Sequence, residues 1–425
     1  MSELLKGEVT GLSSEGQGLL RQGPLVVFIP FTAPGDQINY RISAQKKNFA
    51  RGQLVDILQA SPARVSPLCR YFGQCGGCQL QHIYYSEQLK YKQQIVLDAL
   101  KRIGKMPNSQ VEAVIPAALN WAYRRHVTLK IRPEEGCLKI GYIEVDHQTV
   151  LPVESCPIFI SDHDAAIKEL QSFLKVFLLD LTSEGRATLF KTPADQFILN
   201  LQLEKKLKLN LEIPQIFLQN HSRWAGILLS MGDKKEVWGQ TRTHITLNQL
   251  KWICSPEVFT QNHPEQSAKI YHQITELLKG STKSILDLYC GIGISSLLLA
   301  QQGHGVTGME SNPLSITLAK ESARLNGLSA TFMTGEVEHL LPQLSRAKYD
   351  AVLINPPRIG ISPLALNRIL KLRPREMVYI SCMPSTLARD LALICSQGYQ
   401  IQLIQPYDMF PQTYHVETLV HLVLK

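Results

Sequence analysis

The sequence predicts an α/β protein in which a doubly wound, Rossmann-like parallel sheet follows a small N-terminal β-barrel and a β-rich middle region. From about residue 265, short apolar runs alternate with helical segments and Gly-rich turns. This alternation is typical of parallel α/β sheets. Earlier in the chain, strand-like segments such as "YRRHVTLKI" and "FILNLQL" are separated by turn residues. That pattern is typical of antiparallel strands.

Length and composition set the broad class. The chain has 425 residues, which predicts about three domains. A net charge of +8 is mildly basic and permits a polyanionic partner without requiring one. The N-terminus has no apolar signal core, and no apolar run is long enough to cross a bilayer. We therefore expect a cytoplasmic protein with no membrane contact, and no feature indicates an obligate protein partner.

The first domain, residues 1–60, consists of short strand-like segments punctuated by Gly and Pro, which predicts a small barrel. A barrel that binds oligonucleotides and a barrel that serves as a docking module both fit. The basic residues Lys46, Lys47 and Arg51 favour the first slightly. The second domain spans residues 61–250 and includes a helix at 86–104 that could pack on the third, residues 251–425.

A cysteine cluster follows the barrel. Cys69, Cys75 and Cys78 have C-x5-C-x2-C spacing, and two glycines between the last two leave room for a metal centre. With nine cysteines and a reducing compartment, metal binding or catalysis is favoured over disulfides. Cys156, followed by proline, is the best fourth ligand; Cys137 ranks below it because it lies in a strand-like stretch. Four thiolates suit a [4Fe–4S] cluster or zinc, and the single C-x2-C pair favours the cluster.

A nucleotide-type cofactor site is predicted by "ILDLYCGIGISSLLLA". An apolar strand runs into Gly291 and Gly293, which allow a tight turn and a close approach of the backbone to a ligand. Asp287 can orient this turn. Glu310, about 20 positions further on, ends the next strand, where a carboxylate can bind a ribose. The third glycine of the dinucleotide fingerprint is absent, so a dinucleotide and S-adenosylmethionine both remain possible.

Three further residues stand where strands end or begin. Asn355 follows an apolar strand in "YDAVLINPPR", at the edge where open α/β sheets bind ligands. Cys382, in "YISCMP", is either a small core residue or a nucleophile. Glu417 opens the last apolar strand, and burial would make it a base near neutral pH. We expect Cys382 and Glu417 to meet over one pocket, with His415 lowering the pKa of the thiol.

Together these motifs resemble the RNA uracil-C5 methyltransferase family, over nearly the whole chain. The resemblance rests on "CRYFGQCGGCQLQH" with "ESCPI", "LDLYCGIGISSLLLA", "INPPRIGIS", "YISCMPSTLARD" and "DMFPQTYHVETL", in the family order. It implies an N-terminal TRAM domain that binds RNA, a central domain with an iron–sulfur cluster and a methyltransferase domain that uses S-adenosylmethionine. It also implies that Cys382 is the nucleophile and Glu417 the general base. The positions implied to contact the cofactor or the target base are Gln261, Tyr289, Glu310, Glu336 and Asn355.

The chain departs from the family pattern at three positions. Asn355 stands where many members carry Asp, a feature shared with some ribosomal RNA members, which favours 23S ribosomal RNA over transfer RNA. Met383 replaces the usual Asn after the cysteine, and His263 replaces an Asn. A transfer RNA methyltransferase and a non-catalytic RNA-binding iron–sulfur protein are the alternatives. Methylation of an amino group is disfavoured, because Arg358 stands where that chemistry usually has an aromatic residue.

Overall fold

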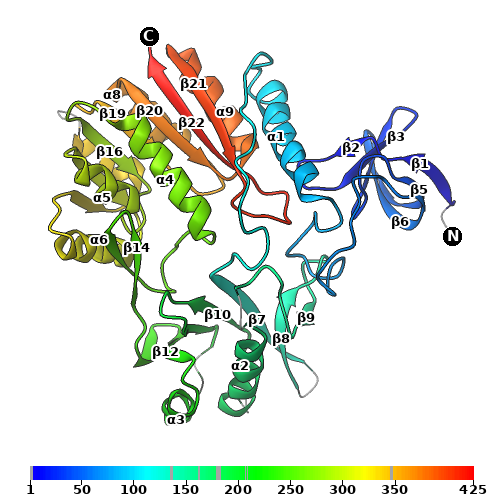
Figure 1. Ribbon diagram of the computed structural model, residues 1–425, viewed down its shortest axis with the longest axis horizontal. Coiled ribbons are helices and arrows are strands. Elements are labelled where there is room, and N and C mark those ends of the chain that lie inside the picture. The colour runs from blue at the N-terminus through cyan, green and yellow to red at the C-terminus, as the bar shows by residue number, and fades with distance from the viewer. Residues whose placement is uncertain are drawn as a thin grey trace.

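The computed structural model resolves the chain into a barrel, a central sheet and a C-terminal α/β domain (Figure 1). In Figure 1 the barrel projects to one side, and the central sheet lies below the C-terminal domain. No helix in the part of the chain that the structure describes is long and apolar enough to span a membrane. The structure describes residues 3–134, 137–160, 163–178, 183–205, 207, 209–344 and 348–425.

The barrel consists of six strands in the order β1-β5-β6-β4-β3-β2. Alternate residues of β5 point inward, as in a strand with one face on a core, so that Ile38 and Tyr40 are buried. Leu20, Val27 and Ile29 complete the small core. The strands are β1 (Leu5–Glu8), β2 (Gly11–Leu12), β3 (Gly18–Gln22), β4 (Leu25–Ile29), β5 (Gln37–Gln45) and β6 (Phe49–Gln59).

The central sheet has seven strands in the order β13-β12-β11-β10-β7-β8-β9. Most neighbours are antiparallel, as predicted, but β11 and β12 are parallel because α3 forms a crossover between them. Phe173 of α2 and Phe217 of α3 pack together against the sheet. The elements are β7 (His126–Glu134), β8 (Cys137–Ile143), β9 (Val150–Pro152), α2 (His163–Phe177), β10 (Gly185–Lys191), β11 (Phe197–Leu203), α3 (Ile213–Asn220), β12 (Trp224–Met231) and β13 (Lys234–Gly239).

The C-terminal sheet also has seven strands, in the order β18-β17-β16-β19-β20-β22-β21. A hairpin of β14 (Thr243–Leu247) and β15 (Leu250–Cys254) precedes it. The other elements are α4 (Pro264–Leu278), β16 (Ser284–Leu288), α5 (Ile294–Gln301), β17 (Gly305–Glu310), α6 (Pro313–Leu325), β18 (Thr331–Thr334), α7 (Val337–Leu340), the 3-10 helix η1 (Leu341–Leu344), β19 (Ala351–Ile354), α8 (Pro363–Leu372), β20 (Glu376–Ser381), α9 (Pro384–Ser396), β21 (Tyr399–Tyr407) and β22 (Glu417–Leu424).

The sheet is mixed, and the prediction of a parallel sheet is wrong for its last strand. β22 lies between β20 and β21 and is antiparallel to both. The loop 408–416 that joins β21 to β22 is too short for a parallel crossover, which needs a dozen or more residues, so the two strands form a hairpin. As a result, the start of β22 lies at the same edge of the sheet as the end of β20.

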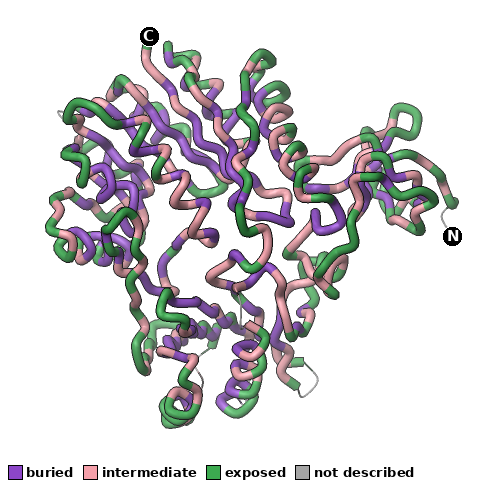
Figure 2. Tube along the Cα trace, viewed as in Figure 1, coloured by how far each residue is buried: buried purple, intermediate pink, exposed green. Residues whose placement is uncertain are grey.

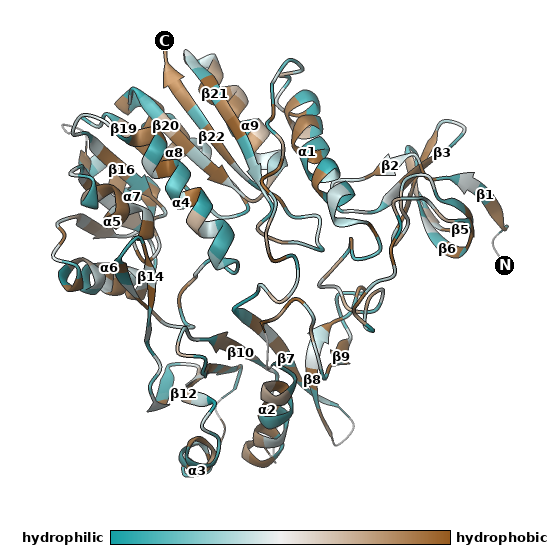
Figure 3. Ribbon diagram, in the orientation of Figure 1, coloured by the Kyte–Doolittle hydropathy of each residue, from teal (hydrophilic) through white to brown (hydrophobic). Residues whose placement is uncertain are grey.

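One long helix from the first half of the chain packs on this domain. Helix α1 (Tyr85–Arg102) lies along α9, and Val96 and Leu100 share a buried core with Leu387 and Leu391. In Figure 2 the central strands of the C-terminal sheet are buried along their length, and in Figure 3 the arrow of β22 is largely hydrophobic. Helix α1 is thus part of the wall of the C-terminal domain.

Candidate active site

Strand pairing brings Cys382 and Glu417 together. Ser381, the last residue of β20, pairs with Thr418 of β22. Cys382 follows Ser381 and Glu417 precedes Thr418, so the two side chains stand at adjacent positions on one edge of the sheet. In a parallel sheet the start of β22 would lie at the opposite edge. The reversed strand is therefore what makes the predicted pair geometrically possible.

The thiol of Cys382 is half-buried. Burial raises its pKa, the charge of Glu417 raises that pKa further, and Arg358 opposes both effects. These influences require Glu417 and Arg358 to lie close to the sulfur, because charge effects fall with distance. The cation favours the thiolate, which is the nucleophilic form of cysteine.

Glu417 is only 4% exposed. Burial raises the pKa of its carboxyl group to about 8, although Arg358 acts in the opposite direction. A buried carboxyl with a pKa near 8 can exchange a proton near neutral pH, which is the property that a general base requires. The sequence-based expectation that burial would raise this pKa is confirmed by this environment.

The cation beside the thiol is Arg358, and the expected role of His415 is wrong. The Arg358 Nη2 atom lies 3.3 Å from His415 Nε2. Burial lowers the pKa of His415 to about 3, and the positive charges of Arg358, Lys92 and Arg124 lower it as well. The imidazole is therefore neutral and does not provide the charge that would lower a thiol pKa. The position of Arg358 directly after Asn-Pro-Pro predicts that it lies at this edge of the sheet. The sequence does not predict that it acts on the pKa of Glu417.

The turn that carries Cys382 is held by backbone contacts. The Ser381 hydroxyl accepts a hydrogen bond from the Met383 N–H at 3.1 Å. Thr386 donates from its hydroxyl to the Met383 carbonyl at 3.1 Å, and Pro384 begins α9. These contacts use the main chain of Met383. The change from Asn to Met at this position therefore leaves the geometry of the turn intact.

The glycine loop after β16 has the strained backbone that a close ligand approach requires. Tyr289, Gly291 and Gly293 all have positive φ angles, of 61°, 55° and 74°. A Cβ atom on Gly293 would lie 2.9 Å from the Phe332 ring. Gly293 is therefore required both by its backbone conformation and by the neighbouring strand β18.

Two carboxylates hold this loop. Glu310 accepts hydrogen bonds from the N–H groups of Gly291 at 3.2 Å and Asn312 at 2.9 Å. Asp287 is buried and accepts from the hydroxyls of Ser295 and Ser296, and burial raises its pKa to about 6. Its other oxygen, Oδ1, has no hydrogen-bond partner among the described atoms.

Further carboxylates surround Tyr289. Burial raises the pKa of its phenol, and the nearby charges of Glu338, Glu336 and Glu310 raise it further. Such a negative surround suits a positively charged ligand, and the methyl donor S-adenosylmethionine carries a sulfonium. Asn355 directly follows β19, and its N–H donates to the Leu288 carbonyl at 3.3 Å. Asn355 therefore lies between the glycine loop and the edge that carries Cys382.

Two predicted positions lie on the segment that joins β15 to α4. Gln261 is half-buried there. His263 is buried, its ring stacks on Tyr123 with centroids 4.8 Å apart, and its Nε2 lies 3.0 Å from the Leu119 carbonyl. The histidine that replaces the expected Asn therefore packs against the segment before β7.

The four predicted cysteine ligands line one cavity of about 60 Å³. Arg124 and Tyr142 also line it, whereas Cys137 is exposed on β8 and is not among the lining residues. Burial raises the pKa of Cys75 to about 11 and that of Cys78 to about 12, and neighbouring thiols add to this effect. Such thiols stay protonated unless a metal centre replaces their protons. The lining cysteines are Cys69, Cys75, Cys78 and Cys156.

The described residues contain no group of three or more His, Cys, Asp or Glu side chains arranged to hold a metal ion. The cavity is several times larger than the space one water molecule needs. Four cysteine thiols and the cationic Arg124 thus line one space. Cysteine thiolates are the ligand type that both structural zinc sites and iron–sulfur clusters use.

Three family models match the chain. The methyltransferase small domain matches residues 249–362, and the tRNA (uracil-5-)-methyltransferase family matches residues 338–425. The TRAM domain of tRNA (uracil(54)-C(5))-methyltransferase matches residues 5–63. The three matches cover the barrel and the C-terminal domain.

Whole-chain relatives match as well. An uncharacterized RNA methyltransferase of Protochlamydia amoebophila is 46% identical over 98% of this chain and 97% of its own length. An uncharacterized RNA methyltransferase of Halalkalibacterium halodurans is 32% identical over 100% of this chain and 98% of its own length. The crystal structure of Pyrococcus abyssi tRNA (uracil-54, C5)-methyltransferase in complex with S-adenosyl-L-homocysteine is 26% identical, with a TM-score of 0.79 over 99% of this chain and 100% of that chain.

Proposed function

The chain belongs to the TRAM-domain family of RNA uracil-C5 methyltransferases, and on that premise we propose that it works through Cys382 as nucleophile and Glu417 as general base. It is an S-adenosylmethionine-dependent RNA methyltransferase. The observation that carries the proposal is the pairing of Ser381 with Thr418, which sets the thiol and the carboxyl side by side. Arg358 lies near both.

The chemistry follows from the substrate. The Cys382 thiolate adds to C6 of uracil, and the electron pair of the C5–C6 double bond makes C5 nucleophilic. S-adenosylmethionine, when bound, would supply the methyl group that C5 takes up and would leave as S-adenosylhomocysteine. Glu417 then removes the C5 proton, the electron pair of the C5–H bond re-forms the double bond, and the thiolate leaves C6. The proton passes from Glu417 to solvent, and Arg358 stabilises the anions in turn.

The target base has to leave its stack to reach this edge, because C5 and C6 are not accessible inside a helix. Single-stranded loops are the RNA elements from which this costs least. We place the target in a loop of 23S ribosomal RNA, on the basis of Asn355 at the end of β19. Transfer RNA is the second candidate, supported by the names of the matching family models and of the Pyrococcus abyssi structure. Mapping 5-methyluridine in both RNAs from cells with and without the gene separates them.

The four cysteines around the small cavity support a [4Fe–4S] cluster as a second cofactor. In such a cluster each thiolate binds a different iron, so the sulfurs need not converge on one point as they do around zinc. The residues that would hold it are Cys69, Cys75, Cys78 and Cys156. Its role in this proposal is to shape the RNA-binding side of the molecule.

The covalent mechanism has a direct test. Cys382→Ala should reduce methylation by a factor on the order of 10⁴ or more, because alanine offers no nucleophile at this position, while RNA binding is retained. Glu417→Gln should stop the reaction after methyl transfer and leave RNA bound to Cys382. The measurements are transfer of labelled methyl groups and a shifted protein band on a denaturing gel. An active alanine variant, or no shifted band with Glu417→Gln, would contradict the mechanism.

A further inference from the structure

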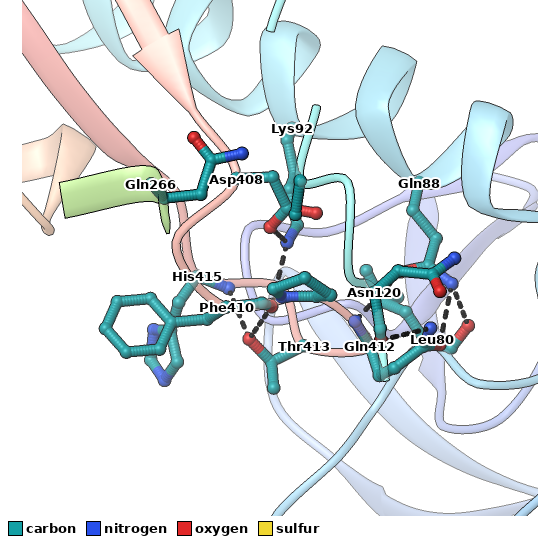
Figure 4. Close-up of polar contacts among 12 residues, drawn as sticks. Leu80, Gln88, Lys92, Asn120, Gln266, Asp408, Phe410, Gln412, Thr413 and His415 are labelled. Carbon is teal, nitrogen blue, oxygen red and sulfur yellow. Dashed lines mark hydrogen bonds and ion pairs between the residues drawn. The ribbon is translucent and has the colours of Figure 1, made fainter. Parts of the chain in front are cut away.

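The loop 408–416 leads directly into Glu417 and is held by segments from the first half of the chain. Figure 4 shows its side chains beneath helix α1, with Lys92 and Gln88 pointing down from the helix. Asp408, Gln412 and Thr413 are buried in the middle of the protein although they are polar. A buried polar loop of this kind needs specific partners, and its partners come from a region about 300 residues earlier in the chain.

The first anchor is a buried ion pair. The Lys92 Nζ atom lies 2.5 Å from Asp408 Oδ1, and neither side chain is exposed. The same ammonium donates to the Phe410 carbonyl at 3.0 Å. Burying two charges is costly, and well-packed apolar residues often replace such a pair without loss of stability. Stability is therefore a poor reason for this pair, which instead fixes where the loop begins.

The second anchor is a reciprocal pair of glutamines. Gln88 donates to Gln412 Oε1 at 3.0 Å and accepts from the Gln412 N–H at 3.1 Å. Gln412 has a φ of 70°, a strained conformation for a residue with a side chain. Its carbonyl accepts from the N–H groups of Gln79 and Leu80, directly after Cys78. Strain of this kind persists where the surroundings enforce it, and it is common beside active sites.

Hydrogen bonds lead from these anchors to the site. The Phe410 carbonyl that Lys92 contacts also accepts from the Thr413 hydroxyl at 2.8 Å. That hydroxyl accepts from the His415 N–H at 3.3 Å. The His415 ring then contacts Arg358 through Nε2. These bonds tie the position of α1 to His415, two residues before Glu417, and so to the start of β22.

We propose that Lys92 and Gln88 are positioning residues that hold the base loop 408–416 so that Glu417 faces the C5 proton. This inference rests on the proposed covalent function. It assigns to α1 a part in one step only, the removal of the proton after methyl transfer. Addition of the thiol depends on Cys382, at the end of β20, and cofactor binding depends on the loop after β16. Neither segment is anchored by Lys92 or Gln88.

The inference has a step-specific consequence. If Glu417 is displaced while Cys382 and the cofactor loop stay in place, methyl transfer proceeds but elimination stalls. RNA then remains bound to the enzyme through Cys382 and survives on a denaturing gel. A residue with a purely structural role would lower every step together, and no such adduct would accumulate.

The experiment compares Gln88→Ala and Lys92→Met with two controls on the same helix. Lys90 is exposed and pairs with Glu87, and Gln94 is bonded to Asp98 at the surface, so Lys90→Met and Gln94→Ala leave the loop untouched. Each protein is incubated with the RNA substrate and S-adenosylmethionine. Turnover of Gln88→Ala and Lys92→Met should fall about 10²-fold, since small displacements have effects of that size. The adduct should accumulate, and the affinity for S-adenosylhomocysteine should change less than about twofold.

Lys92→Met leaves the Asp408 carboxylate buried without its partner, which can prevent folding. The double variant Lys92→Met/Asp408→Asn removes both charges while keeping side chains of similar volume. It therefore tests the inference even if Lys92→Met alone does not fold. A folded variant that turns over like the wild type overturns the inference. Slow turnover without accumulation of the adduct also overturns the inference. A loss of S-adenosylhomocysteine binding that accompanies the loss of turnover overturns it as well. The wild type and Glu417→Gln report separately on the proposed function. If they give neither 5-methyluridine nor an adduct, the function itself fails.

Discussion

Cys382 and Glu417 share one cation, Arg358, and both are acids whose neutral form is favoured by burial. The thiol has to lose its proton before it attacks, and the carboxyl has to be deprotonated before it accepts one. In the free protein both groups are therefore in the wrong protonation state at low pH. Arg358 is the residue that brings them toward the reactive state, because a cation stabilises thiolate and carboxylate alike.

We expect activity to rise with pH. The pKa of Glu417 is raised to about 8, so kcat/KM for RNA should increase through that region as the carboxyl loses its proton. Arg358→Met should move the midpoint upward, because both acids lose the cation that favours their charged forms. The measurement is the initial rate of methylation from about pH 6 to about pH 10. Arg358→Lys keeps the charge and is the control, and a flat profile for the wild type would contradict the assignment of Glu417.

For single residues, the sequence predicts which side chains take part in the site but not the charged groups that surround them. Cys382 and Glu417 could be named because each stands at the end of a readable apolar strand. The role of Arg358 could not be predicted from the sequence, because it depends on which side chains the reversed strand β22 brings near it. His415 was expected to be the cation, and its burial among Arg358, Lys92 and Arg124 makes it neutral. Burial by segments distant in the chain leaves no local sequence pattern.

At the scale of elements, the glycine loop and the last strand differ in how far the sequence predicts them. The loop after β16 is readable because two glycines between an apolar strand and a helix are typical of a turn that approaches a ligand. The reversed direction of β22 cannot be predicted in this way, because β22 has the same apolar pattern that a buried parallel strand would have. Only the length of the loop 408–416 distinguishes a hairpin from a crossover, and that length is known only once the ends of both strands are known.

Gly293 gives a prediction at this scale. Gly293→Ala should weaken binding of S-adenosylhomocysteine at least about tenfold, because the new methyl group would overlap the Phe332 ring and shift the loop. Gly303→Ala is a matched control, because Gly303 also has a positive φ, of 87°, but no atom within 4 Å of an added Cβ. It shares the backbone cost of about 1 kcal/mol without the overlap. Calorimetric titration measures both, and equal effects on binding would contradict the role of the overlap.

At the scale of the whole molecule, the cysteine cavity joins two segments that are far apart in the chain. Cys69, Cys75 and Cys78 lie on the segment after the barrel, whereas Cys156 follows β9 of the central sheet. The segment is also tied to β8 by main chain, since the Gly76 N–H donates to the Ile143 carbonyl at 3.0 Å. A group bound by all four thiolates would therefore cross-link this segment to the central sheet and add its binding energy to their association.

The cluster assignment is testable by metal content. Anaerobically prepared protein should be brown, with an absorbance band at about 400 nm from iron bound to thiolates. Cys156→Ser should lose most of its iron, because it removes the ligand from the central sheet. Cys137→Ser should keep it, because Cys137 lies on the surface away from the cavity. A colourless protein that contains one zinc, or equal iron in both variants, would reverse the assignment.

The glutamine pair that holds the base loop has a consequence for the order in which the protein folds. Gln88 and Gln412 are 324 positions apart in the chain. The glycine loop, β17 and Glu310 lie within some 20 residues of one another. Closing a long loop costs more chain entropy and is slower than making local contacts. We therefore expect a refolding chain to be able to hold its methyl donor before it can complete a methylation, with the base as the last part of the site to form.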